Sequence, residues 1–434
     1  MSTQTFLPVD RDAVHALSEH NKEPQWVAEL RLKGLELAEA LELPFVEKTK
    51  LDRWDLSRYG SYQAADPIGS VQELPEEARS LFGESFSNSL LIQRNSGVVY
   101  NKLSEAALAQ GVIFTDLETA ARDHEELVKP YFMKAVEQGE NRFTALHSAV
   151  WSGGVFLYIP KGVHVELPVQ SVFLTDGENG ACAPHVLIVA EADSSVVYVE
   201  NVVSLGEEGG RVVNSVTEVF AKAGAKVQFA SIHSLNASIT DLTCRRAVIE
   251  NDARVEWIIG EMNHGNAISD TTSLLKGNGS SSDAKVICVG SGEQKLSLTT
   301  RAVHFGKASD SDMITRAVMR DGATAIINGI TKIEKGATGA NGQQTEKVLM
   351  LSPKARGDAN PILLIDEDDV KAGHAASVGQ VNPEQVYYLM SRGIPKETAQ
   401  KLIVYGFLAP VVSEIPIAKI EDQLNALVER KLEQ

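Results

Sequence analysis

The sequence predicts a mainly β protein, in which a right-handed parallel β-helix, residues 141–381, lies between an N-terminal helical region, 1–140, and C-terminal helices, 382–434. Three observations lead to this expectation. The centre of the chain repeats a short strand phrase, its content of Val, Ile, Thr, Ser and Gly favours strands and tight turns, and both ends carry helical patterns.

The N-terminal region combines helices with an irregular connection. Residues 26–41, WVAELRLKGLELAEAL, are rich in strong helix formers, and Pro24 ahead of them suits a first helical turn. A second helical pattern covers 117–136 and contains Pro130, where we expect a kink or a break. The polar stretch 66–77 between these helices predicts a loop.

The pattern changes at the start of the central region. Residues 143–174 alternate apolar segments with Gly and Pro, which predicts strands and turns rather than helix. Further on, a small or acidic turn residue followed by an apolar strand recurs as DSSVVYV, GAKVQFA, DARVEWI, DAKVICV and SDSDMIT. The leading apolar residues, Val196, Val227, Val255, Val286 and Met313, are 31, 28, 31 and 27 positions apart.

Self-similarity at this spacing, without intervening helices, predicts a solenoid of stacked strands in which each repeat supplies about a coil and a half. A β-sandwich is the alternative, because it also has many short strands. Its turns, however, recur at shorter intervals and without such sequence echoes.

Helical patterns return near the C-terminus. Asn382, followed by Pro and Glu, is a helix start signal, and Gly393 can end that helix. A second helix is predicted from Lys396 into Phe407. A third, 417–432, is amphipathic, with Ile417, Ile420, Leu424, Leu427, Val428 and Leu432 on one face. Such a stripe must bury against another surface, which is either the end of the solenoid or another chain.

Charge and hydropathy exclude several classes of partner. The net charge of −17 disfavours binding to nucleic acid, which needs clustered Lys and Arg. Residues 1–10 lack a basic segment followed by an apolar run, and about 18 consecutive apolar residues occur nowhere. We therefore expect a cytoplasmic protein with no membrane contact.

Motifs for catalysis or for an autonomous metal site are missing from the sequence. The three cysteines, Cys182, Cys244 and Cys288, form no CxxC pair and are too few for a four-thiolate cluster site, so buried thiols are expected. There is no GxxxxGK[ST] loop, so we expect no nucleotide on this chain, and no hydrolase motif. The acidic run 366–369 is interpreted as a turn, and no catalytic residue is predicted.

Two segments resemble the SufB/SufD family of iron-sulfur cluster assembly proteins. Residues 142–170, RFTALHSAVWSGGVFLYIPKGVHVELPVQ, look like the start of the family's β-helix. Residues 301–407 contain LMLSPKA, NP, DDVKxxHxAxxGQ and YYLMSRGI in the family's order. With the helical N-terminus, the resemblance covers nearly the whole chain.

Within this family the chain resembles the D-type subunit. Where B-type subunits carry cysteines, matching on LML places Glu346 and Ala355 in this chain. The histidine that D-type subunits have in the DDVKxxH phrase is His374 here. Ala372 stands where many D-type sequences have a cysteine, which puts a thiol role at that position in doubt.

The resemblance implies a non-catalytic scaffold that pairs with the paralogue SufB and docks the ATPase SufC on the helices after the β-helix. A transient iron-sulfur cluster would be shared at the seam between the paralogues, with His374 coordinating iron; nothing in the sequence supports a flavin. The candidate paralogue interface comprises Glu346, Lys347, Leu349, Leu351, Asp369, Val370 and His374. The candidate ATPase dock comprises Tyr387, Leu389, Arg392, Ile394, Lys396, Leu402, Ile403 and Phe407, with Leu408 extending its apolar surface.

Other interpretations stay open at this point. His374 could be a structural histidine, and the C-terminal helices a self-contained cap on the solenoid. Parallel β-helices also form carbohydrate-active enzymes, although the four tryptophans here are widely scattered. Within the family, a B-type scaffold or a homodimer of the isolated chain is the closest alternative.

Overall fold

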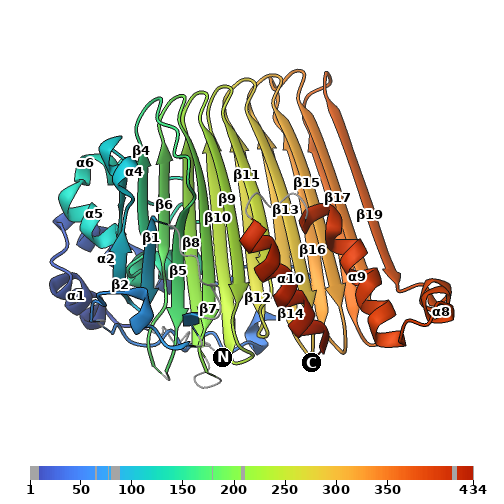
Figure 1. Ribbon diagram of the computed structural model, residues 1–434. Helices are drawn as coiled ribbons and strands as arrows, with labels where there is room; N and C mark the ends of the chain where they lie inside the picture. The colour runs from blue at the N-terminus through green and yellow to red at the C-terminus, as the bar shows by residue number, and fades with distance from the viewer. Residues whose placement is uncertain are drawn as a thin grey trace.

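The computed structural model describes residues 9–63, 66–76, 78–79, 88–177, 179–206, 211–412 and 418–433. Its centre is a solenoid in which the strands of two sheets stack along one axis, as Figure 1 shows. The strands are parallel except in the hairpin β1–β2 and the pair β3–β4. The mainly β class, the parallel β-helix core and the helices at both ends are therefore confirmed.

Consecutive solenoid strands alternate between the two sheets, so each turn contributes one strand to each. The ten-stranded sheet contains, in spatial order, β2 (Gly97–Lys102), β1 (Leu90–Arg94), β5 (Val169–Thr175), β7 (Ser195–Ser204), β9 (Lys226–Ser234), β11 (Arg254–Glu261), β13 (Ser281–Gly290), β15 (Asp310–Met319), β17 (Asn341–Met350) and β19 (Lys371–Gln380). The nine-stranded sheet contains β3 (Ile113–Thr115), β4 (Val155–Ile159), β6 (His185–Ala190), β8 (Arg211–Ala221), β10 (Ile239–Ile249), β12 (Ala267–Leu275), β14 (Lys295–His304), β16 (Thr324–Ile333) and β18 (Arg356–Ile365).

The strand register agrees only in part with the predicted repeat. Val196, Val227 and Val255 are direct neighbours on β7, β9 and β11. Val255, however, pairs with Ser282, so Val286 lies further along β13 than the repeat predicted. The prediction of about a coil and a half per repeat is also wrong, because one repeat forms one turn.

The turns explain this difference. Asp193, Gly224 and Asp252 open the first three repeated phrases and have φ angles of 59°, 71° and 55°, a left-handed conformation that Gly and Asp tolerate well. In the last two phrases the acidic residues lie inside strands. The left-handed turn residues there are Gly279 and Ala308, which precede the phrases.

The lumen of the solenoid is filled by every second side chain of each strand. Tyr198, Phe229 and Trp257 occupy equivalent positions in three successive turns. Their ring centroids are 5.3 and 5.0 Å apart, so neighbouring turns stack aromatic faces and edges on each other. The repeat therefore encodes a continuous core along the axis.

The N-terminal region is helical with short connections. Its helices are α1 (Arg11–His20), α2 (Gln25–Ala40), α4 (Glu105–Ala109), α5 (Leu117–Asp123), α6 (Glu125–Val128) and α7 (Arg142–Val150), and its 3-10 turns are η1 (Leu51–Arg53) and η2 (Val71–Glu73). The predicted helix at 26–41 and the break at Pro130 are confirmed. The prediction of strands is wrong for 142–150, because Asn141 caps a helix there: its side chain accepts from the N–H groups of Phe143 and Thr144.

One end of the solenoid is closed. Leu91 of β1, Ala107 of α4 and Phe114 of β3 are buried in the same core as the lumen side chains. Beside them, Phe132 and Trp151 pack with other N-terminal side chains against the outer face of the first strands of the nine-stranded sheet. The N-terminal region therefore covers both the first turn and one flank.

The C-terminal helices are α8 (Pro383–Ser391), α9 (Lys396–Val412) and α10 (Ala418–Glu433). Asn382 caps α8 as predicted, accepting from the N–H of Glu384. In Figure 1, α9 and α10 lie across the ten-stranded sheet. Leu424 and Val428 are buried there with outward-facing residues such as Ile258, so the stripe packs on the side of the solenoid and not on its end. Ile417 lies outside the described residues.

The other end of the solenoid, formed by β18 and β19, is not covered by any described element; we call it the open end. Leu364, Ile365 and Val378 there are 47%, 42% and 44% exposed. Among the described residues, no helix combines the length and apolar character that a membrane crossing requires.

Candidate functional site

His374 lies on β19, the last strand of the ten-stranded sheet, and is exposed. Its neighbour across the ladder is Gln344 of β17. Gln344 is buried in the lumen, where its side-chain oxygen accepts a 2.9 Å hydrogen bond from the hydroxyl of Thr331 on the opposite sheet. Parallel strands in register point equivalent side chains to the same face. His374 therefore belongs to the lumen row of the last turn, at the open end.

Glu346 is two residues beyond Gln344 in the same lumen row and is only 1% exposed. Neither carboxylate oxygen has a hydrogen-bond partner in another described residue. Burial raises the pKa of Glu346 to about 7, because the charged form loses its hydration. A buried acid without partners is costly to the fold, which marks this position as unusual.

The other candidate interface residues do not form one surface with this pair. Lys347 and Leu349 alternate to the outer face of β17, and Leu351 follows the strand. Asp369 and Val370 lie in the turn before β19, where Val370 packs on a small apolar cluster of Ile333, Ala337 and Ala340. The candidates therefore divide among lumen, outer face and turn.

The acidic run before β19 forms a turn, as predicted. Glu367 points inward and accepts 2.9 Å hydrogen bonds from the N–H groups of Gly336 and Asp368. Its neighbours Asp366, Asp368 and Asp369 are exposed. The run therefore holds two adjacent loops together and presents no paired acid and base.

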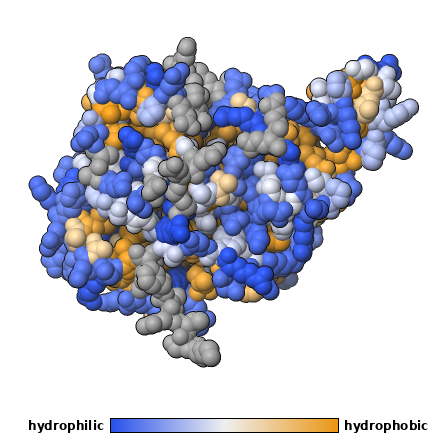
Figure 2. Space-filling model, turned by 90° about the horizontal axis from the view of Figure 1, so that it is seen from below, coloured by the Kyte–Doolittle hydropathy of each residue, from blue (hydrophilic) through white to orange (hydrophobic). Residues whose placement is uncertain are grey.

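The candidate ATPase dock contains a groove between α8, α9 and β17. It encloses about 660 Å³ and is lined by Leu349, Asn382, Glu384, Gln385, Tyr388, Leu389, Ile403, Gly406 and Phe407. Figure 2 shows α8 projecting from the body of the molecule, with apolar surface at its base. Three of the predicted dock residues, Leu389, Ile403 and Phe407, therefore share one groove.

The remaining dock candidates do not line this groove, and Ile394 is half-buried in the connection between α8 and α9. Tyr387 and Leu402 are 73% and 47% exposed. Lys396 lines a second groove of about 450 Å³ on the other side of α8. Arg392 is exposed and lies 5.3 Å from the ring centroid of Tyr388. Leu408 is buried against the ten-stranded sheet, so the expectation that it extends the dock surface is wrong.

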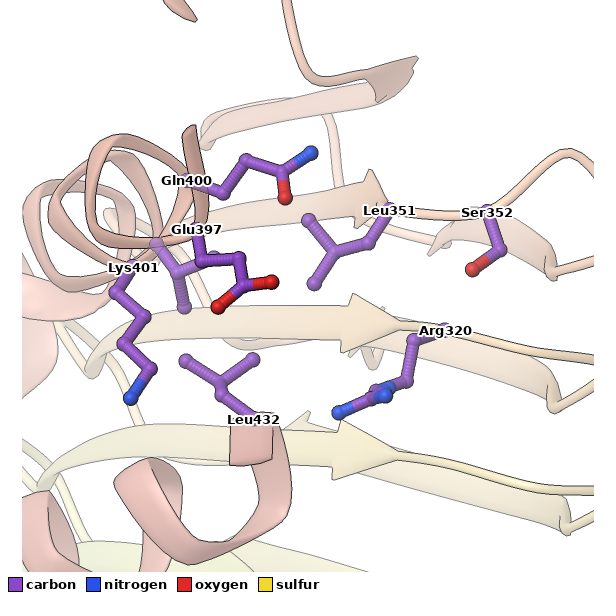
Figure 3. A pocket seen from close by; sticks show the side chains of 8 residues that line it. Arg320, Leu351, Ser352, Glu397, Gln400, Lys401 and Leu432 are labelled. Atoms are coloured by element: carbon purple, nitrogen blue, oxygen red, sulfur yellow. The ribbon is translucent and has the colours of Figure 1, made fainter. Parts of the chain in front are cut away.

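A further pocket that the sequence did not indicate lies where α9 and the end of α10 meet the solenoid. It encloses about 440 Å³ and is lined by Arg320, Leu351, Ser352, Glu397, Gln400, Lys401, Val404 and Leu432. In Figure 3 the α9 side chains Glu397 and Lys401 lie across from Arg320. Arg320 also donates a 2.8 Å hydrogen bond to the backbone oxygen of Lys431, which fixes the last turn of α10.

One cluster inside the lumen has the residue types of a metal site, but the guanidinium group of Arg245 contacts it. Ligand atoms of His233, Asp241 and Glu261 lie within 4.8 Å of one another. His233 Nδ1 is 2.6 Å from Asp241, and its Nε2 is 2.7 Å from the guanidinium of Arg245. These contacts use both ring nitrogens, so the cluster is a hydrogen-bonded network. Its members come from three different strands, which is why no local motif pointed to it.

The cysteines are buried, as expected for structural thiols. Cys182 and Cys288 lie in the lumen, and burial raises the pKa of each thiol to about 12. Cys244 is partly buried, and burial also raises its thiol pKa. None is therefore a ready thiolate ligand or nucleophile.

Comparison with known proteins identifies the family. Residues 83–171 match the model of the SufBD protein N-terminal region, and residues 173–407 match that of the SUF system FeS cluster assembly, SufBD core domain. The second match alone covers more than half of the chain. The chain belongs to the SufB/SufD family.

Its relatives place it in the SufD branch of this family. It is 47% identical over 436 residues to the iron-sulfur cluster assembly protein SufD of Bacillus subtilis, covering all of both chains. It is 29% identical to the SufB protein of the same organism, with 98% of this chain and 93% of the relative covered. A SufBD family protein of Staphylococcus epidermidis is also 29% identical, covering 97% and 92%. The resemblance stated from the motifs is thus confirmed.

Proposed function

We propose that this SufD-type chain is a cytoplasmic, non-catalytic scaffold subunit for iron-sulfur cluster assembly, which pairs with the paralogue SufB through the open end of its solenoid. The observation that carries the proposal is the placement of His374, a lumen-row imidazole exposed on an edge strand. Edge strands present unpaired N–H and C=O groups, which a second chain can satisfy. Apolar Ile365 and Val378 on the same rim would be buried by such a partner.

The cluster is the cargo of this scaffold and is shared with the partner. His374 would supply one ring nitrogen to iron, whereas the thiolates come from the partner, since the thiols of this chain are buried. Of the other candidate interface residues, Lys347 on the outer face of β17 and Asp369 and Val370 in the turn before β19 would contact the paralogue around the site. Membership in a cluster assembly family supports this scaffold over a carbohydrate-active enzyme.

The ATPase SufC would dock on α8 and α9. Support comes from the apolar groove that contains Leu389, Ile403 and Phe407, and from the exposed side chains Tyr387 and Leu402 beside it. Because α9 also packs on the ten-stranded sheet, movement of a docked ATPase would be transmitted to the solenoid. The energy for rearrangement would thus come from ATP hydrolysis on another chain.

Co-expression with a SufB-type paralogue and a SufC-type ATPase tests the proposal. We expect the three chains to co-purify, and anaerobic reconstitution with iron and sulfide to give the visible absorption of a cluster. Mass measurement of the isolated chain decides whether it forms a homodimer when alone. Failure of the three chains to associate, or turnover of a substrate by the isolated chain, would refute the scaffold role.

A further inference from the structure

We infer that Glu346 is a second iron ligand on this chain, and that its carboxylate and the imidazole of His374 together bind Fe²⁺ at the open end. The inference rests on the proposed function for the identity of the metal and for the role of His374. It adds a ligand that neither the family match nor the histidine motif assigns.

The first argument is that Glu346 has no structural partner. Its side chain is almost fully buried, yet neither oxygen is hydrogen-bonded to another described residue. Protonation would not resolve this, because the resulting hydroxyl would also need an acceptor. Glu218, which is equally buried, accepts hydrogen bonds from four backbone N–H groups and from His185. The fold can therefore satisfy a structural carboxylate, but it leaves Glu346 unsatisfied.

The second argument is that space is reserved for this carboxylate. Gly329 of β16 faces Glu346 across the lumen, and a Cβ at Gly329 would overlap Oε1 of Glu346. Gly329 does not have a positive φ angle, so its backbone does not require glycine. The missing side chain instead gives the carboxylate its room.

The third argument is access and reach. The residue paired with Glu346 on β19 is Ala376, a small side chain, and β19 is the last strand before the open end. His374 lies two positions before Ala376 in the same row. Diagonal neighbours on one sheet face are about 7–8 Å apart at Cα, a separation that a metal ion bound to both side chains can bridge. Gln344, the direct neighbour of His374 across the ladder, is held by Thr331.

The chemistry of the pair suits ferrous iron. Carboxylate oxygen and imidazole nitrogen are both ligands of Fe²⁺, and two protein ligands leave coordination positions for sulfur and for a partner's thiolates. The proposed site would thus combine oxygen and nitrogen ligands from this chain with sulfur ligands from the partner. The two paralogues would thereby contribute complementary ligands.

Titration of the full-length chain with Fe²⁺ alone, anaerobically and followed by calorimetry, tests the inference. Glu346→Gln keeps the shape of the side chain, and Gly329→Ala displaces the carboxylate without changing it. We expect both variants to weaken Fe²⁺ binding at least about tenfold. The control Glu293→Gln, which removes an exposed carboxylate from another turn, should bind like the parent.

A second readout separates a ligand from a structural group. Because Glu346 is buried without partners, Glu346→Met, which removes the polar group, should unfold at a higher temperature than the metal-free parent. Co²⁺ can replace Fe²⁺ for spectroscopy, and its visible absorption bands should change in Glu346→Gln and not in the control.

Equal Fe²⁺ binding by the parent and Glu346→Gln would overturn the inference. Loss of the folded solenoid in both Glu346→Gln and Gly329→Ala would do the same, because the carboxylate would then be structural. If His374→Ala binds Fe²⁺ normally while Glu346→Gln does not, the proposed role of His374 fails and that of Glu346 stands.

Discussion

The imidazole rings of His147 and His185 meet inside the molecule, with Nε2 of the first 3.0 Å from Nδ1 of the second. The chain of contacts continues on both sides. His147 Nδ1 is 2.9 Å from the backbone oxygen of Asn214, and His185 Nε2 is 3.0 Å from the carboxylate of Glu218. All four residues are buried. This network joins helix α7 to strands β6 and β8, and so holds the N-terminal region against the solenoid.

Glu218 should therefore be essential to stability. Its carboxylate also accepts from the backbone N–H groups of residues 133–136, at 2.6 to 3.0 Å. In Glu218→Gln the amide has one acceptor oxygen, and its NH₂ group would face N–H donors. We expect the free energy of unfolding to fall by at least about 2 kcal/mol, measured by chemical denaturation. Glu137→Gln in the same loop is exposed and should have little effect; equal stabilities would contradict the role of the network.

His374→Ala should abolish cluster formation and leave assembly of the complex intact. The side chain is exposed, so its removal creates no cavity. The measurements are co-purification with both partners and visible absorption after anaerobic reconstitution. Ser377→Ala on the same strand is the control, because Ser377 alternates to the outer face. A His374→Ala complex that builds clusters at the parent's rate would exclude the ligand role.

Lys431 should make stability depend on pH in the alkaline range. Its ammonium group is 1% exposed and donates to the backbone oxygens of Asn263 and Val289 and to the side chain of Gln294. Burial lowers the pKa of Lys431 to about 8, against about 10.4 in an unfolded chain. Between these values the unfolded chain holds a proton that the folded chain lacks, so stability rises with pH in that window.

This contribution amounts to at most about 1.4 kcal/mol per pH unit. Denaturant titrations between pH 7.5 and pH 10 on the parent and Lys431→Met isolate it, because the variant lacks the group while all other titrating groups remain. The parent should gain stability relative to the variant as the pH increases. Parallel pH profiles of the two proteins would show that Lys431 does not titrate in this range.

Replacing two leucines of the C-terminal helices with alanine should affect different properties, the stability of the fold in one case and binding of the ATPase in the other. Leu424 is buried on the ten-stranded sheet, where its Cδ1 lies near the position that a Cβ on Gly260 would occupy, whereas Leu402 is 47% exposed. Leu424→Ala should lower the free energy of unfolding by about 2–5 kcal/mol through the cavity that it creates.

Leu402→Ala should instead leave stability within about 0.5 kcal/mol and weaken binding of the ATPase in a pull-down. Normal ATPase binding by Leu402→Ala combined with Tyr387→Ala would place the dock elsewhere. Leu424→Ala serves as the structural control, because the buried side chain of Leu424 cannot contact a docked ATPase directly.

Much of the fold could be predicted because the relevant signals are local. The turn residues Asp193 and Asp252 and the cap at Asn382 determine their backbone through neighbouring atoms alone, and all three predictions were confirmed. The helix at 142–150 differs from the prediction because its composition is strand-like and its main helical signal is the single capping residue Asn141.

The candidate site was only partly predictable, because the pairing register of stacked strands brings its residues together from distant parts of the chain. His374 was found from a motif, but the isolation of Glu346 from hydrogen-bond partners depends on Gly329, which lies on a different sheet. The sequence motif also could not reveal that the C-terminal stripe packs on the flank. That placement depends on outward-facing residues of several separate strands.

The two ends of the solenoid are chemically unlike, and this limits how copies can join. At the first turn, side chains of β1, α4 and β3 fill the end of the lumen, whereas no described element covers the last turn. In the proposed pairing, two last turns face each other. Such a pair buries the open end of both solenoids at once, so a third molecule has no open end to bind and the assembly does not extend into a fibre.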